Sequence, residues 1–149
     1  MPNRTGKNRL LKLAALLEAD AKNKKGVKFD LGIWGYSKEV AVTPVSVSCG
    51  TTACAVGLAV VSGAFKRSGL YNDAYLPGKI LPGFDNKVGF DAVEAFFDLK
   101  EREAAFLFED DSYPDDLCRG AKGERAVAKR IRQFVGRTLR RKRETTPRT

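Results

Sequence analysis

The stretch 123–141, GERAVAKRIRQFVGRTLRR, decides the fold class of this chain. Its apolar residues recur every three or four positions, which is the spacing of one face of an α-helix. On a helical wheel this face spans about 100° of arc, and basic residues cover the opposite side. The face consists of Val127, Ile131, Phe134, Val135 and Thr138. The pattern predicts a helix with one side packed on a core and a basic outer side.

Four further stretches have helical character. They are residues 7–23, 53–65, 91–97 and 101–108. The first repeats Leu10, Leu13 and Leu17 at helical spacing and ends in lysines followed by Gly26, which are typical helix-ending residues. The second is rich in small residues, which favour close packing of a central helix. We therefore predict a mainly α fold, a compact bundle of about five helices with extended loops and at most a minor β-hairpin.

The stretches between these helices favour extended or irregular structure. Residues 29–34 alternate apolar side chains and end in Trp34, which we expect to plug the core. Valines surround Pro44 in 36–48, which favours an extended loop or at most an edge hairpin. Residues 68–89 contain several glycines and prolines and predict a long irregular loop. The predicted core consists of Leu10, Leu13, Leu17, Trp34, Val56, Leu58, Phe96, Phe97, Leu107, Ile131 and Phe134.

Length and composition fit one domain. The chain has 149 residues and 43% hydrophobic residues, near the globular average, so it needs neither a metal nor a disulfide to fold. We expect a helical domain over 1–137 and a basic, disordered tail over 138–149, which is rich in arginine. No apolar run approaches the roughly 20 residues of a membrane-spanning helix, and the basic N-terminus leads into no signal-peptide segment. We expect no membrane span and a cytoplasmic location.

The chain contains no histidine. This removes the commonest general base near neutral pH and the commonest metal ligand, so Ser-His-Asp and Cys-His active sites are excluded. A zinc site would need all three cysteines, Cys49, Cys54 and Cys118, together with a carboxylate, and their spacing is not that of a CxxC knuckle. We therefore expect no cofactor and no metal site, and the sequence favours a non-enzymatic protein over an enzyme.

Cys49 is the one residue at which we look for a nucleophile. It precedes the expected start of the central helix, where the backbone N–H groups of Gly50 and Thr51 would lower a thiol pKa. No candidate base adjoins it in the sequence. A packed small cysteine beside the helix cap is the simpler interpretation. A thiol enzyme built on Cys49 stays the third hypothesis.

Charge is strongly segregated along the chain. Residues 1–28 carry 8 basic and 2 acidic groups, 91–118 carry 2 and 10, and 119–149 carry 12 and 2. The acidic block of 91–118 includes Glu109, Asp110, Asp111, Asp115 and Asp116. Paired carboxylates suit a hard cation such as Mg²⁺ or Ca²⁺, but these do not have the EF-hand spacing, and an acidic surface between helices is the simpler interpretation.

The basic last helix and tail give the leading functional hypothesis. Guanidinium groups fit phosphates well, so we expect a non-enzymatic protein that holds the nucleic-acid backbone without sequence specificity. The residues predicted to do so are Arg130, Arg132, Arg137, Arg140, Arg141, Lys142 and Arg143. Three alternatives stay open: a solvated face, a face neutralised by the acidic block, and binding to anionic lipid, which the lack of bulky apolar residues disfavours.

The second functional hypothesis is a protein-protein accessory or inhibitor of bacterial or phage origin. Such a protein would use either the acidic residues 109–116 or the basic helix against a partner protein.

Several motifs together resemble a group of small uncharacterised proteins of bacteria and their phages. The most specific is the block Cys-Gly-Thr-Thr-Ala-Cys-Ala-Val-Gly at 49–57. The others are Phe-Asp-Leu-Gly-Ile-Trp at 29–34, Phe-Phe-Asp-Leu at 96–99, Ala104-x-x-Leu107-Phe108 and Val127-Ala128-x-Arg130-Ile131. The aspartate of 96–99 stands where the group has glycine, and the arginine-rich tail is an addition. The group has no established activity, so the resemblance implies a bacterial or phage setting and transfers no site residues.

Overall fold

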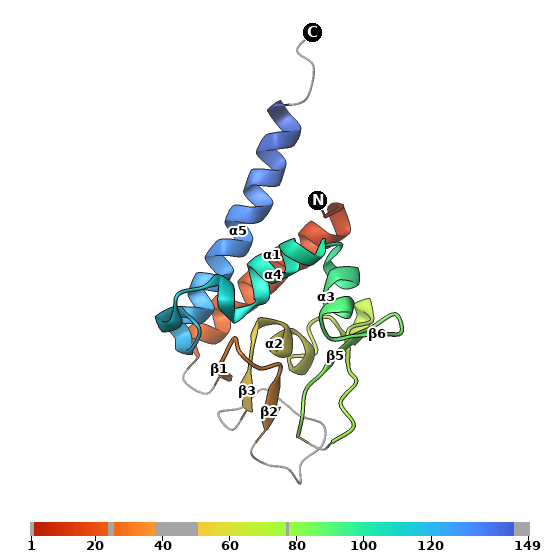
Figure 1. Cartoon of the computed structure of the whole chain (residues 1–149), viewed down its shortest axis with the longest axis vertical. Helices are drawn as coiled ribbons and strands as arrows, with labels where there is room; N and C mark the ends of the chain where they lie inside the picture. Colours follow the sequence, from red (N-terminus) through yellow and green to blue (C-terminus); the bar gives the residue numbers. More distant parts are fainter. Residues whose placement is uncertain (1, 24–25, 38–50, 77, 145–149) are drawn as a thin grey trace.

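The computed structural model describes residues 2–23, 26–37, 51–76 and 78–144, and for 138–144 it describes the helical backbone alone. Five α-helices dominate the described part of the chain (Figure 1). They are α1 (Arg4–Lys22), α2 (Ala55–Val61), α3 (Gly89–Phe97), α4 (Glu101–Phe108) and α5 (Gly120–Glu144). Three short 3-10 helices join them, η1 (Lys66–Ser68), η2 (Asp110–Ser112) and η3 (Asp115–Leu117). The prediction of a mainly helical fold with about five helices is confirmed.

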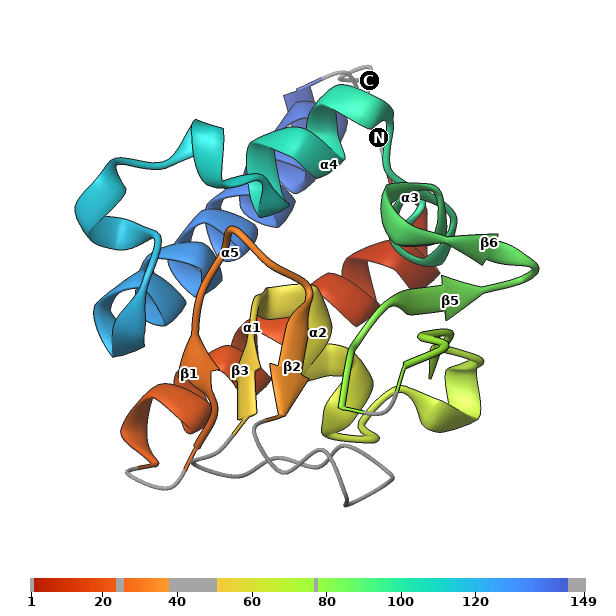
Figure 2. The same ribbon diagram turned by 60° about the horizontal axis from the view of Figure 1, so that its bottom comes forward.

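The prediction of at most one minor β-hairpin is wrong, because the described residues form two small three-stranded sheets (Figure 2). The first has the order β1 (Lys28–Phe29), β3 (Thr51–Ala53), β2 (Gly35–Ser37), with β1 parallel and β2 antiparallel to β3. The second has the order β4 (Tyr71–Asn72), β5 (Pro82–Phe84), β6 (Lys87–Val88) and is antiparallel throughout. Each strand is only two or three residues long, so alternation of apolar side chains does not reveal it.

The second sheet lies inside the predicted irregular loop 68–89. Asp85 and Asn86, with φ of 51° and 63°, form the two-residue connection between β5 and β6. Aspartate and asparagine tolerate this left-handed conformation better than most residues, and two such residues in succession are typical of a tight hairpin. The Asp-Asn pair was therefore the sequence signal for this hairpin.

The central helix is shorter than predicted. The β-branched residues Thr51 and Thr52 lie in the strand β3 instead of leading into a helix. Cys54 then forms the N-cap of α2. Gly57 of α2 lies so close to the carbonyl oxygen of Trp34 that an added Cβ would overlap it. The small residue therefore lets the helix pack directly against the chain entering β2.

The core joins the helices to both sheets. Of the predicted core residues, Trp34 and Phe134 are only partly buried, and all the others are buried. Trp34 contacts Phe90 with a ring-centroid distance of 4.9 Å instead of filling the core. Edge-to-face contacts join Phe65 to Phe96 at 5.3 Å and Phe84 to Phe96 at 5.1 Å. The second sheet is thus held to α3 by aromatic packing.

The longest helix, α5, packs along α1 in its first half and projects beyond the rest of the described chain at its C-terminal end (Figure 1). Its 25 residues correspond to a length of about 37 Å. Apart from its chain neighbours and the backbone of its own helix, no described atom lies within 4 Å of a Cβ built on Gly136. The helical backbone reaches Glu144, within the segment 138–149 that was predicted as a tail. Among the described residues, no helix is long and apolar enough to cross a membrane.

Candidate functional site

Two of the predicted nucleic-acid-binding arginines make contacts within the protein. The Nη1 of Arg130 donates to the carbonyl oxygens of Phe106 at 2.9 Å and Ser112 at 2.7 Å. The same guanidinium lies over the rings of Tyr113 and Phe106, at 3.7 Å and 4.5 Å from their centroids. Arg130 therefore links α5 to two segments of the acidic block, α4 and η2.

Arg132 connects α5 to α1. Its Nε and Nη2 donate to the two carboxylate oxygens of Glu18, at 3.1 Å and 2.5 Å. This hydrogen bonding holds the pKa of Glu18 below its usual value. The two side chains keep exposed fractions of 45% and 40%, so water and other anions still reach the pair. Arg132 is therefore occupied but remains accessible.

The other predicted residues lie farther along α5. Arg137 is exposed and forms no ion pair with another described residue. Arg140, Arg141, Lys142 and Arg143 lie on the helical backbone that projects from the body, and their side chains are outside the described part. The fold thus separates the predicted set into an inner pair that makes intramolecular contacts and an outer group on the free end of the helix.

Among the described side chains, the contacts of the acidic block with basic residues of α5 lie in the first half of the helix. Lys122 Nζ lies 3.8 Å from the carboxylate of Asp116, and Arg130 donates to the carbonyl oxygen of Ser112. Beyond these contacts, the exposed residues Arg125 and Lys129 form no ion pair with any residue of known placement. Neutralisation by the acidic block is therefore partial.

A basic stripe runs along the exposed side of α5. Its members within the described side chains are Lys122, Arg125, Lys129 and Arg132. They are three or four residues apart and so share one face of the helix. In the sequence Arg140 and Arg143 lie on the same face, eight and eleven residues after Arg132, and Arg137 lies about 80° around the helix from Lys129, at the edge of this stripe. The distance along the axis from 122 to 143 is about 30 Å, which matches an elongated anion better than a small one.

Cys49 lies outside the described residues, and the helix start expected beside it occurs later in the chain. The helix α2 begins at Ala55, and its N-cap is Cys54, whose Sγ accepts from Gly57 N at 3.3 Å. Burial raises the pKa of the Cys54 thiol to about 11. The thiol at the N-terminus of α2 is therefore that of Cys54, which is buried and not activated. Among the residues with described placement, no group of three or more Cys, Asp or Glu side chains could share a metal ion.

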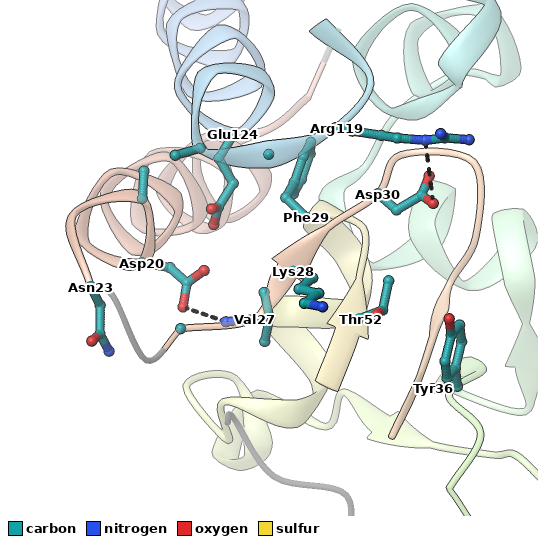
Figure 3. A pocket seen from close by; sticks show the side chains of 14 residues that line it. Asp20, Asn23, Val27, Lys28, Phe29, Asp30, Tyr36, Thr52, Arg119 and Glu124 are labelled. Carbon is teal, nitrogen blue, oxygen red and sulfur yellow. Dashed lines mark hydrogen bonds and ion pairs between the residues drawn. The ribbon is translucent and has the colours of Figure 1, made fainter. Parts of the chain in front are cut away.

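A pocket that no sequence pattern indicated lies between the C-terminal end of α1, the strands β1 and β3, and the start of α5 (Figure 3). Its volume is about 700 Å³. Arg119 lies 3.7 Å from the carboxylate of Asp30 on one side of the pocket, and Lys28, Tyr36 and Thr52 also line it. This volume lies in the range of small-molecule sites.

Two buried carboxyl groups also line the pocket. Asp20 and Glu124 have exposed fractions of only 8% and 2%, and their carboxyl groups point toward one another (Figure 3). Asp20 Oδ1 accepts weakly from Val27 N at 3.4 Å. Asp20 Oδ2 and Glu124 Oε2 are buried, and no other donor among the described residues reaches them. Burial, and then a side-chain hydrogen bond with Asp20 and the charge of Asp20, raise the pKa of Glu124 to about 9, so at neutral pH Glu124 holds a proton that it donates to Asp20.

The sequence did contain a signal for this pair. Asp20 follows Leu10, Leu13 and Leu17 on the apolar stripe of α1, at the next position of the repeat. Glu124 comes three residues before Val127 and lies on the buried face of α5. An acidic residue in register with an apolar stripe predicts a buried carboxyl group, whereas the pairing of two such residues across the fold needs the structure.

The resemblance to small bacterial and phage proteins stays a prediction. Comparison of the chain with protein-family models, with curated proteins and with solved structures finds no match in any of the three.

Proposed function

We propose that this protein binds nucleic acid without sequence specificity, by laying the basic stripe of α5 along the phosphate backbone. The observation that carries the proposal is the projection of this helix from the body, with Lys129 and Arg137 exposed and without an ion pair among the described residues. A helix that stands clear of its own domain can approach a long polyanion without a steric clash. We propose further that it acts in the cytoplasm.

The basic residues divide into two roles in this proposal. Arg130 positions the helix, because its guanidinium is committed to the carbonyl oxygens of Phe106 and Ser112. Lys129, Arg137 and the residues 140–143 contact phosphates, while Arg132 exchanges Glu18 for a phosphate when nucleic acid is present. Such an exchange loses little free energy, because an exposed ion pair contributes only about 0–1 kcal/mol to stability.

The physical driving force is the release of counterions. Each phosphate neutralised by a lysine or arginine releases condensed cations, so affinity falls steeply with salt. The net charge of +9 supports fast, non-specific association with any polyanion. The acidic block disfavours DNA on the α4 side, which orients the nucleic acid toward α5.

A binding assay with matched variants tests the proposal. Labelled DNA and RNA, each as duplex and single strand, are titrated with the full chain and with the double variant Lys129→Gln/Arg137→Gln. The control Lys66→Gln/Arg67→Gln removes the same charge from η1, where both side chains are also exposed. We expect the α5 variant to weaken binding and the η1 variant to leave it nearly unchanged.

Equal weakening by both variants would reduce the binding to net charge alone and contradict a site on α5. If none of the four nucleic acids binds at low salt, the proposal fails, and the second hypothesis, an acidic partner protein on the basic helix, takes its place.

A further inference from the structure

A row of polar side chains crosses one face of the first sheet. Thr52 of β3 pairs with Lys28 of β1 on one side and with Tyr36 of β2 on the other, and Tyr36 pairs in turn with Lys79. Residues paired directly across neighbouring strands point to the same face of a sheet. Lys28, Thr52 and Tyr36 line the pocket (Figure 3). We call these four residues the polar row.

The polar row holds an aromatic ring between two cations. Tyr36 has an exposed fraction of 36%, and the ammonium of Lys79 lies 5.3 Å from its ring centroid. Lys28 and Lys79 are exposed and form no ion pair with another described residue. Strands in a sheet are about 4.8 Å apart, so the row spans about 14 Å. A matching ligand has a flat ring with an anionic group on either side.

Thr52 adds a hydroxyl group between the ring and Lys28. The residue has an exposed fraction of only 8% and lines the pocket, and its hydroxyl forms no hydrogen bond with another described residue. Buried polar groups in native proteins nearly always have a partner. A hydroxyl both donates and accepts, so it suits the polar edge of a ring whose donors and acceptors vary.

We propose that the polar row binds an unpaired nucleotide of single-stranded nucleic acid, with its base stacked on Tyr36 and the phosphates on its two sides bound by Lys28 and Lys79. Every base has a flat face, so such stacking tolerates any sequence. A base inside a duplex is paired and stacked and does not reach the ring. A cation on each side of the ring favours a nucleotide within a strand, because a free mononucleotide carries phosphate on one side only.

The acidic residues of the pocket do not exclude a phosphate from the polar row. Asp30 lies 3.7 Å from Arg119 and accepts from Gly32 N at 3.0 Å. Asp20 and Glu124 are buried and share a hydrogen bond with each other. The charged groups that the row itself presents are the two ammonium groups at its ends.

This inference extends the proposed function, because the pocket adjoins the basic stripe. Gly120, the first residue of α5, lines the pocket, and Lys122, the first member of the stripe, follows two residues later. A strand whose phosphates lie along the stripe continues into the pocket. The stripe thus binds any nucleic acid, and the row adds a preference for single strands.

The affinities of a labelled oligothymidylate and of a DNA duplex of the same length provide the test. In the full chain, Tyr36→Leu should weaken binding of the single strand by about 5- to 150-fold, the contribution of one stacked base, and leave duplex binding unchanged. Tyr36→Phe keeps the ring and should keep the single-strand affinity. Unchanged duplex binding also shows that Tyr36→Leu is folded. An unaltered single-strand affinity in Tyr36→Leu, or equal losses for strand and duplex, would overturn the proposal.

Tyr75→Leu is the matched control. Tyr75 has an exposed fraction of 96% and lies outside the polar row, so its removal should change neither affinity. Equal weakening by Tyr75→Leu would overturn the assignment of stacking to Tyr36. Thymidine monophosphate, added as a competitor, should displace the oligothymidylate only weakly. Displacement at an equal nucleotide concentration would assign the row to a free nucleotide and contradict a strand.

The same assays separate this proposal from the phosphate-binding α5. Lys129→Gln/Arg137→Gln should weaken binding of strand and duplex alike. If it changes neither while Tyr36→Leu weakens the strand, the basic stripe fails and the polar row stands. If it weakens both while Tyr36→Leu has no effect, the polar row fails and the basic stripe stands. A chain that binds no nucleic acid at low salt would overturn both.

Discussion

The carboxyl group of Glu124, near the start of α5, faces that of Asp20, near the end of α1, and the two share a hydrogen bond through a proton held on Glu124. The helices α1 and α5 pack along each other, so the pair sits at a main contact of the fold. Such a pair makes the stability of the contact depend on protonation, because two ionised carboxylates cannot be buried together cheaply.

The free energy of unfolding should therefore fall as pH rises, because Glu124 loses its proton in the folded protein. The pKa of Glu124 is raised from 4.5 to about 9 on folding, so the folded chain holds a proton that the unfolded chain has lost. The contribution of Glu124 is complete below about pH 4.5 and declines as pH rises toward 9. Glu124→Gln imitates the protonated form at every pH. Denaturant unfolding at several pH values should show the variant gaining stability over the wild type between pH 5 and 9, and a constant difference would contradict the pKa shift.

Arg130 should contribute to stability rather than to nucleic-acid binding. Arg130→Ala removes charge-assisted hydrogen bonds to Phe106 and Ser112 and the contact with the ring of Tyr113. Each such hydrogen bond contributes about 1.5–3 kcal/mol, so a loss of at least about 2 kcal/mol in unfolding free energy is expected. The neighbouring exposed Lys129→Ala serves as the control and should change stability by less than about 0.5 kcal/mol. Comparable destabilisation of both variants would show that the Arg130 contacts do not stabilise the fold.

Glu18 should restrain Arg132. Glu18→Gln breaks an exposed ion pair, so it should cost no more than about 1 kcal/mol of stability. It also frees Arg132 for a phosphate and removes a negative charge from the site, so nucleic-acid affinity should rise severalfold. The variant is assayed beside the wild type at fixed salt. A decrease in affinity would show that the pair positions α5 for binding instead of competing with it.

Two glycines should respond in opposite directions to alanine. A Cβ at Gly57 would overlap the carbonyl oxygen of Trp34, and overpacking of this kind costs about 1–3 kcal/mol. Gly136 lies within α5 with nothing within 4 Å of its added Cβ, so Gly136→Ala should stabilise the helix by up to about 1 kcal/mol. Thermal unfolding of both variants checks the contrast. Stabilisation by Gly57→Ala would contradict the close approach of α2 to Trp34.

Sequence patterns predicted the helices well because their apolar residues repeat over several turns. Leu10, Leu13 and Leu17 define α1, and Val127 and Ile131 define α5. The two sheets were not predicted. Strands such as β1 and β3 pair across the chain, Lys28 with Thr52, and are too short for a period to appear.

The candidate sites were predictable to different degrees. The basic outer side of α5 followed from residue spacing, whereas the engagement of Arg130 and Arg132 depends on segments distant in the sequence, 106–112 and Glu18. The pocket likewise depends on Asp20 and Glu124 meeting across two helices. Contacts of this kind are set by tertiary packing and leave only a weak local signature.

The most direct test of a phosphate-binding α5 is the salt dependence of DNA-duplex affinity for the full chain and for Lys129→Gln/Arg137→Gln. A plot of log affinity against log salt should be steep for the wild type. In the variant it should be flatter by about 0.9 for each phosphate that the substituted side chains no longer neutralise. Identical slopes for the two proteins, or a wild-type affinity that does not change with salt, would contradict a phosphate-binding α5.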